Sequence, residues 1–144
     1  MKTVTFCGHK DILMNDAEII RERVRDEVEK LVGRGADPFL LGGYGNFDIM
    51  CAKIVREFKE KYPHITSVHV VAYMDKPLDT KLYDYADFPP LEKVPLKFAI
   101  PKRNQYMVKK ADAVVAYVKF GWGGSAKTLE YAEKKKKEII RIQI

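Results

Sequence analysis

Two glycine-rich segments of the chain each follow a short apolar run. Their glycines are Gly42, Gly43, Gly45, Gly123 and Gly124. Glycine adopts positive φ without strain and lets a ligand approach the backbone closely. Where a helix begins just after such a turn, its first N–H groups lack partners and attract an anion. Together the two segments predict a phosphate or ribose site, although for either one alone a tight strand-to-helix turn explains the glycines equally well.

A third loop and two hydroxyl side chains belong to the same predicted site. Gly8 and His9 follow the first apolar run, 3–7, and Ser125 and Thr128 follow the second glycine segment. His9 either contacts an anion or faces solvent, and the two hydroxyls can add hydrogen bonds to a ligand. If the preceding runs are parallel strands, the three loops meet at one edge of the sheet, where open α/β sheets bind their ligands.

Charged and aromatic side chains complete the set of candidates. The guanidinium of Arg103, with Asn104 beside it, can grip a phosphate through two parallel N–H donors, and the alternative is a surface salt bridge. Asp48 lies in the first turn of a predicted helix, where it either accepts a hydrogen bond from a ribose hydroxyl or stabilises the helix dipole. Trp122 and Tyr73 either stack on a base or cover the edge of the sheet.

Strand and helix patterns alternate along the chain. Short runs rich in β-branched and aromatic residues predict five strands, at 3–7, 39–41, 67–72, 113–118 and 139–142. Apolar residues three and four apart predict helices between them, at 15–33, 102–110 and 125–137, and a further helix whose apolar spacing runs from Ile49 to Phe58 and whose first turn holds Asp48. Asn15 or Asp16 is a natural N-cap for the first helix. The segment 75–101, rich in Asp, Pro and Tyr, predicts a long loop with one short helical turn.

This alternation predicts an α/β fold, a Rossmann-like and mainly parallel sheet of about five strands with helices on both faces. A length of 144 residues and the lack of a Pro- or Ser-rich linker predict one domain over 1–144. The apolar run near the N-terminus is too short for a signal peptide or a membrane span, which predicts a cytoplasmic protein with no membrane partner.

The charged and metal-ligating residues narrow the choice of partners. A net charge of +6 favours anionic partners, which include nucleotides and nucleic acid. The basic run 134–137 ends the last predicted helix, at the edge of the sheet opposite the glycine loops. Cys7 and Cys51 do not form a metal-binding spacing with the three histidines, so we expect reduced cysteines and no metal.

Four motifs in order carry a resemblance to a known family. They are FCGH at 6–9, LGGYGNFD at 41–48, RNQYMV at 103–108 and GGSAKT at 123–128. Together they resemble the YpsA-like branch of the SLOG superfamily over nearly the whole chain. The superfamily is Rossmann-like and includes cytokinin-activating phosphoribohydrolases, the DNA-processing protein DprA and domains proposed to sense nucleotides related to NAD and ADP-ribose. The resemblance thus implies nucleotide chemistry.

The resemblance also identifies where this chain departs from the hydrolases. Arg103, Met107 and Thr128 follow the order of the phosphoribohydrolase motif, but Tyr131 occupies the position of its catalytic Glu. Glu130 is adjacent to Tyr131, but one residue of displacement rotates a helical side chain by about 100°. Glu130 therefore does not simply take over the role of the catalytic Glu. A carboxylate at this position supports an oxocarbenium-like transition state in glycosidic cleavage.

Three functions follow from these observations. The first is a sensor or binding module for a nucleotide or an ADP-ribose- or NAD-like ligand, which requires no cofactor. The alternative is an N-glycosidic hydrolase or transferase in which Asp48 or Glu130 supplies the carboxylate. The second alternative is DprA-like nucleic-acid binding. The sequence leaves open the identity of the ligand and whether the chain forms a homo-oligomer.

Overall fold

A computed structural model describes residues 2–74 and 76–144 of the chain. Its strands form one sheet in the order β4-β3-β2-β1-β5-β6, and every neighbouring pair is parallel. The strands are β1 (Lys2–Gly8), β2 (Ala36–Leu41), β3 (Ser67–Val70), β4 (Tyr85–Asp87), β5 (Ala113–Tyr117) and β6 (Glu138–Arg141). The helices are α1 (Met14–Gly33), α2 (Asn46–Lys61), α3 (Ala99–Lys110) and α4 (Gly124–Lys134), with a short 3-10 turn η1 (Leu96–Phe98).

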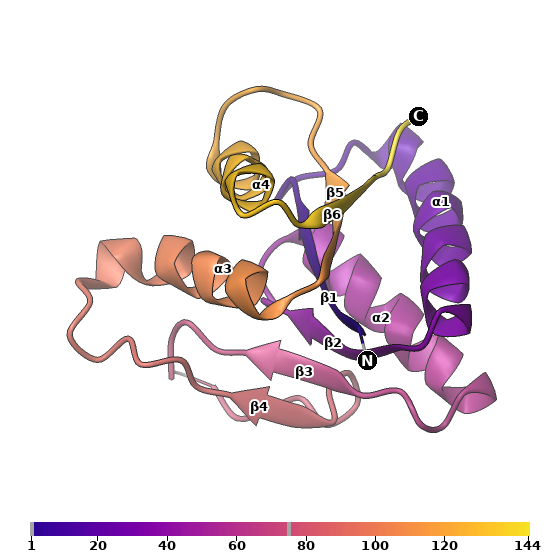
Figure 1. Ribbon diagram of the computed structural model, residues 1–144, viewed down its shortest axis with the longest axis horizontal. Coiled ribbons are helices and arrows are strands. Elements are labelled where there is room, and N and C mark those ends of the chain that lie inside the picture. The colour runs from indigo at the N-terminus through magenta and orange to yellow at the C-terminus, as the bar shows by residue number, and fades with distance from the viewer. Residues whose placement is uncertain (1, 75) are drawn as a thin grey trace.

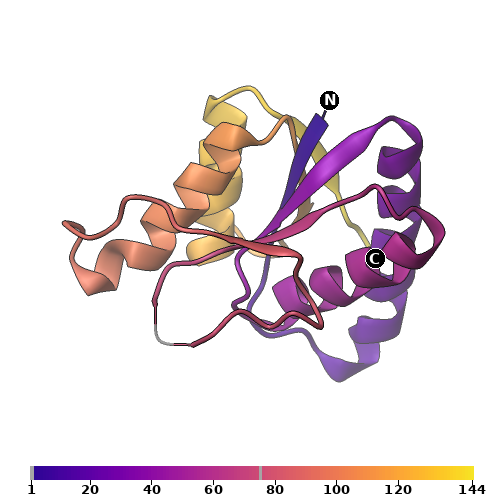
Figure 2. The same cartoon turned by 90° about the horizontal axis from the view of Figure 1, so that it is seen from below.

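The helices cover both faces of the sheet, as the alternation of motifs predicts. Figures 1 and 2 show α1 and α2 on one face and α3 and α4 on the other. Side chains alternate accordingly along β1, because successive residues of a strand point to opposite faces. Val4 and Phe6 pack in the core beneath α1 and α2, whereas Cys7 packs with Val108 of α3 and Leu129 of α4.

The sheet has six strands rather than five. The additional strand, β4, lies within the segment predicted to be a long loop. Its backbone pairs with β3, and the amide of Asp84 just before it donates to the carbonyl of Ser67 at 2.9 Å. The carboxylate of Asp84 accepts from Lys59 at 3.0 Å and from the amide of Ser67 at 2.9 Å. These contacts join the segment to α2 and β3, so an apparent loop becomes an edge strand.

Two helix starts differ from the sequence predictions. Helix α1 begins at Met14, and Leu13 holds the N-cap position without a side-chain hydrogen bond, so neither Asn15 nor Asp16 caps it. Helix α3 begins three residues earlier than the periodicity indicates, at Ala99, because η1 leads directly into it. The earlier start places Arg103 in the second turn of α3, on the side that faces the sheet.

The strand order reverses between β1 and β5. The chain adds β2, β3 and β4 on one side of β1, then returns to add β5 and β6 on the other side. The crevice at the carboxyl ends of two such strands is the usual ligand site of an open parallel sheet. Within residues 2–74 and 76–144, no helix combines the length and apolar character needed to cross a bilayer.

Candidate functional site

A cavity of about 280 Å³ opens at the carboxyl ends of β1 and β5, and we call it the β1–β5 cavity. Three loops meet there, as the motif order predicts. Its lining includes nine of the predicted ligand residues, which are Gly8, His9, Asp48, Arg103, Asn104, Gly123, Gly124, Ser125 and Thr128. Trp122, a predicted base-stacking residue, also lines it, and the structure adds Phe6, Cys7, Lys10, Tyr44 and Ile100 to the set.

Arg103 is the buried cation of this cavity, and its residue surface is 3% exposed. Nη1 donates to the carbonyl oxygens of Gly42 at 2.6 Å and Val70 at 3.1 Å, and Nε donates to Oδ1 of Asn104 at 3.0 Å. Across the described residues, no carboxylate oxygen lies within 4.0 Å of the guanidinium, and Nη2 has no hydrogen-bond partner. Arg103 is therefore not in a surface salt bridge, and Nη2 is the nitrogen left for a ligand.

Asp48 is a partly buried carboxyl on the first turn of α2, at the wall of the same cavity. Burial raises the pKa of Asp48 to about 6, against the opposing effects of the Arg103 charge and of the backbone amides of Tyr44 and Gly42. A carboxyl with this pKa exchanges a proton near neutral pH, which is the property that a general acid or base requires.

His9 joins two of the loops instead of facing solvent alone. Its Nε2 accepts a hydrogen bond from the amide of Lys119 at 2.6 Å, and Nδ1 lies 3.0 Å from Oγ of Ser125. Because Nε2 is an acceptor, the neutral ring carries its proton on Nδ1 and donates to Ser125. Burial, together with the charge of Lys119, lowers the pKa of His9, which favours this neutral form. The hydroxyl hydrogen of Ser125 is then free to point into the cavity.

The glycines of the first segment are required by the packing of the protein itself. A Cβ on Gly42 would lie 2.8 Å from Oδ2 of Asp48 and 2.9 Å from Cζ of Arg103. A Cβ on Gly43, whose φ is +69°, would lie 2.5 Å from Nε2 of His69. A Cβ on Gly45 would likewise overlap Lys10, and a Cβ on Gly8 would overlap the ring of Phe47. For this segment, close internal packing explains the glycines without a ligand.

The second glycine segment differs, because it borders open space. A Cβ built on Gly123 or Gly124 meets no atom within 4 Å, and both residues line the β1–β5 cavity. Gly123 has φ +94° and is the N-cap of α4, so the first amides of α4 follow it directly. This segment has the geometry of an anion site at a helix N-terminus.

We expect the two segments to respond differently to the addition of one methyl group. Gly42→Ala should lower the free energy of unfolding by about 1–3 kcal/mol, because its Cβ overlaps Asp48 and Arg103. Gly124→Ala should leave folding stability unchanged within about 0.5 kcal/mol or raise it slightly, since it adds a good helix former in open space. Urea denaturation of both variants measures the difference, and equal stability of the two would contradict this assignment.

A second cavity, of about 290 Å³, lies at the carboxyl ends of β2 and β3, and we call it the β2–β3 cavity. It shares Tyr44, Ile100 and Arg103 with the β1–β5 cavity, and His69, Tyr73 and Phe88 are among its other lining residues. Its lining includes the predicted ligand residues Gly42, Gly43 and Arg103 and the predicted base-stacking residue Tyr73, but sequence reasoning did not separate it from the β1–β5 cavity. The sequence feature that indicates this cavity is the group of aromatic residues in the segment 73–88, which follows β3.

The remaining predicted residues are placed as follows. Thr128 is buried, and its hydroxyl donates to the carbonyl of Gly124 at 3.0 Å. Glu130 is exposed on α4 and does not line either cavity. Burial raises the pKa of Cys7 to about 12, so its thiol is protonated at the edge of the site. In the part of the chain that the structure describes, no three His, Cys, Asp or Glu side chains are grouped to hold a metal ion.

The sequence matches no protein-family model and no curated protein. Solved structures of similar fold include the X-ray structure of TM1055, with a TM-score of 0.65 and 18% identity, which aligns over 96% of this chain and 72% of that one. Another is DNA processing protein A (DprA) from Streptococcus pneumoniae, with a TM-score of 0.66 and 15% identity over 98% of this chain. A third is the molybdenum cofactor carrier protein from Chlamydomonas reinhardtii, with a TM-score of 0.65 and 15% identity over 98% of this chain.

These likenesses establish the fold and nothing finer. The chain spans half the length of DNA processing protein A and 76% of the molybdenum cofactor carrier. The Rossmann-like α/β fold expected from the sequence is therefore confirmed.

Proposed function

We propose that this protein is a binding module or sensor for a nucleotide or a nucleotide-derived ligand. In this proposal the ligand's phosphate lies in the β1–β5 cavity, against Arg103 and the N-terminus of α4. The YpsA-like branch of the SLOG superfamily, which the motifs resemble, is the branch to which we assign the chain. A solved structure of similar fold is a carrier of the molybdenum cofactor, and it supports small-molecule binding as a use of this architecture.

The observation that carries the proposal is the state of Arg103. An arginine that is 3% exposed usually has a carboxylate partner, because an unpaired buried charge is costly. Here two backbone carbonyls and Asn104 hold the guanidinium, and Nη2 is left without a hydrogen bond among the described residues. The Asp48 carboxyl stabilises the Arg103 charge from beyond hydrogen-bond distance, and an anion in the cavity would be the direct acceptor for Nη2.

The open N-terminus of α4 supplies a second anchor in the same cavity. The amides that follow Gly123 lack helical partners, and the hydroxyl of Ser125 is oriented by His9. Lys10 also lines the cavity and adds positive charge. Asp48 is the acidic residue among these cavity-lining residues. Its raised pKa limits the repulsion of an anion below about pH 6.

Asp48 favours a second candidate function, cleavage or transfer at an N-glycosidic bond. It lines the cavity and has a pKa of about 6, which suits a carboxyl that gives and takes a proton. Glu130, the other carboxylate considered, lies on the exposed side of α4 and would have to move to reach the cavity. If the protein is an enzyme, we therefore assign the carboxylate role to Asp48.

Nucleic-acid binding is a third proposal, which the similarity of fold to DNA processing protein A supports. The basic run 134–137 lies at the C-terminal end of α4, away from the open N-terminus of that helix. Binding along that run alone would therefore use a different surface from the β1–β5 cavity. Such binding would weaken steeply with added salt, because it depends on phosphate contacts.

Calorimetric titration with AMP, ADP, ADP-ribose, NAD and a short single-stranded DNA separates the three functions. We expect one of the nucleotides to bind with one-to-one stoichiometry, and at a hundred times its Kd to add about 2.7 kcal/mol to folding stability. Chromatography of each mixture then detects a released base, which would indicate the enzyme. The binding proposal fails if no nucleotide binds while the DNA binds in a salt-sensitive manner.

A further inference from the structure

We propose that the two cavities form one site for a two-part ligand. This inference rests on the proposed function. The ligand is a nucleoside diphosphate derivative that carries a group on each side of its pyrophosphate. Its aromatic base lies in the β2–β3 cavity. Its pyrophosphate runs from Arg103 toward the N-terminus of α4 in the β1–β5 cavity, which also holds its second group.

The cavities meet at three residues that line both of them, Tyr44, Ile100 and Arg103. Arg103 is the one charged side chain in this shared set, and its Nη2 has no partner among the described residues. A cation at the junction of two cavities suits an anionic group in the middle of a ligand. Each cavity has a volume of 280–290 Å³, just below the roughly 300–1,000 Å³ typical of ligand sites, so a ligand that uses both fits that range better.

The chemistry of the β2–β3 cavity suits a flat ring. Phe88 and Tyr73 line it and are 57% and 39% exposed, which leaves much of each ring free for contact. The hydroxyl of Tyr73 donates to the carbonyl of Leu96 at 3.0 Å, so that ring is held in place. His69 stacks on Tyr83 with ring centroids 4.7 Å apart. Exposed aromatic rings around a cavity bind bases by stacking.

The β1–β5 cavity offers different chemistry. Its wall includes the open Gly123–Gly124 backbone, the Ser125 hydroxyl and Asn104, which are hydrogen-bonding groups suited to a sugar or a phosphate. Trp122, at 72% exposed, lies at its rim. The two cavities meet at Arg103, and a mononucleotide would leave one of them unfilled.

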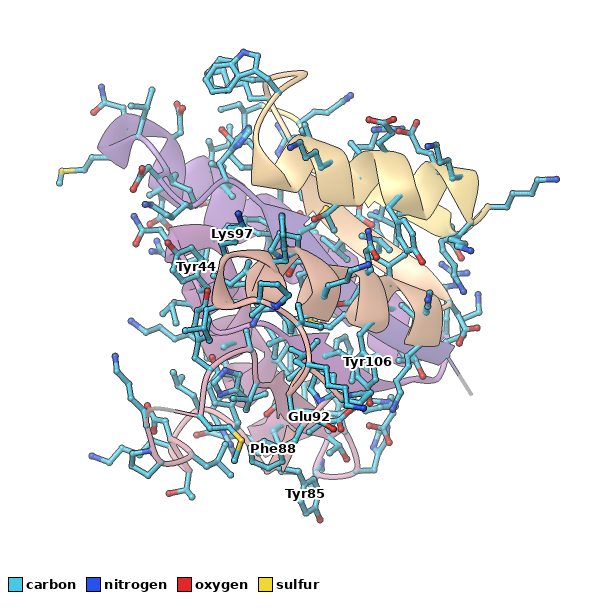
Figure 3. All side chains as sticks on the ribbon, turned by 90° about the vertical axis from the view of Figure 1, so that its left-hand side faces the viewer. Tyr44, Tyr85, Phe88, Glu92, Lys97 and Tyr106 are labelled. Atoms are coloured by element: carbon cyan, nitrogen blue, oxygen red, sulfur yellow. The ribbon has the colours of Figure 1, made fainter. Side chains whose placement is uncertain are left out.

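The edge of the β2–β3 cavity provides a matched pair of aromatic residues. Phe88 lines the cavity, whereas Tyr85 is 64% exposed on β4, three residues away, and is not among the lining residues of that cavity. Figure 3 labels both side chains and shows Tyr85 pointing away from the molecule at the edge of the sheet. Removal of either ring exposes little new core, so both variants should fold.

Calorimetry with ADP-ribose, AMP and ribose 5-phosphate tests the inference. We expect ADP-ribose to bind at least about tenfold more tightly than AMP, because it reaches both cavities. Phe88→Ala should weaken ADP-ribose binding roughly 5- to 100-fold, the usual scale for loss of one stacking ring, and should leave ribose 5-phosphate unchanged within about twofold. Tyr85→Ala should change neither.

Two results would overturn the inference while leaving the proposed function intact. One is an affinity for AMP equal to that for ADP-ribose. The other is an unchanged affinity of Phe88→Ala for ADP-ribose while Gly124→Ala, whose added methyl group projects into the space of the β1–β5 cavity, binds ADP-ribose less tightly. That pair of results would place the ligand in the β1–β5 cavity alone. If the wild-type protein binds none of the three ligands, the proposed function fails and the inference fails with it.

Discussion

Arg103→Ala should lower the free energy of unfolding by about 2–4 kcal/mol and abolish nucleotide binding. The stability loss arises because the carbonyls of Gly42 and Val70 lose their donor, and an unsatisfied buried polar group costs about 1–3 kcal/mol. The binding loss arises because Arg103 is the charged side chain that lines both cavities. Urea denaturation and calorimetry measure the two effects separately.

Lys102→Ala is the matched control for this variant. It removes one positive charge from the neighbouring position of α3, but Lys102 is exposed. We expect its stability to lie within about 0.5 kcal/mol of the wild type and its nucleotide affinity to be retained. If Arg103→Ala were as stable as Lys102→Ala, the two carbonyl contacts would not have the structural role that we assign to them.

Asp48→Asn should stabilise the protein at pH 8 and have little effect at pH 4. Burial raises the pKa of Asp48 to about 6 in the folded protein, whereas an unfolded Asp has a pKa of about 3.9. The folded state therefore holds the proton more tightly. The stability that the protonated Asp48 carboxyl contributes to the folded state is fully present below about pH 4 and is lost as the pH rises through 6. Asn stays neutral, so the variant should gain about 1–3 kcal/mol above pH 7.

Urea denaturation of the wild type and Asp48→Asn from pH 4 to pH 8 measures this difference. The comparison with Asp26→Asn, an exposed position of α1, controls for the general loss of a negative charge. We expect that control to differ from the wild type by no more than about 0.5 kcal/mol at either pH. A stability difference for Asp48→Asn that is independent of pH would contradict the assignment of a raised pKa.

The sequence predicts the parallel sheet and the layer arrangement because those depend on local patterns. The run 113–117 is apolar throughout, as expected of a strand buried on both faces, and α2 shows helical spacing from Ile49 to Phe58. Strand β4 escapes such reasoning, since three residues with the sequence Tyr-Ala-Asp carry no recognisable pattern. It becomes a strand through pairing with β3 and the hydrogen bonds of Asp84.

The location of the candidate site could be predicted from the sequence, but the separate roles of its residues could not. Topology alone brings the three loops to one edge, and the motifs identify them. The glycines at 42 and 43, however, are fixed by Arg103 and His69, which are distant in sequence. The bridging of two loops by His9 likewise depends on Lys119 and Ser125, and no local pattern encodes those contacts.

The most direct test of the central claim is an NMR titration of the ¹⁵N-labelled protein with ADP-ribose, observed at backbone amides. We predict saturable shifts at Gly123, Gly124 and Ser125, which line the β1–β5 cavity, and no change at Gly33 and Gly35 near the opposite edge of the sheet. Shifts confined to the basic run 134–137, or no saturable shifts at any amide, would contradict the proposal that this edge of the sheet binds a nucleotide.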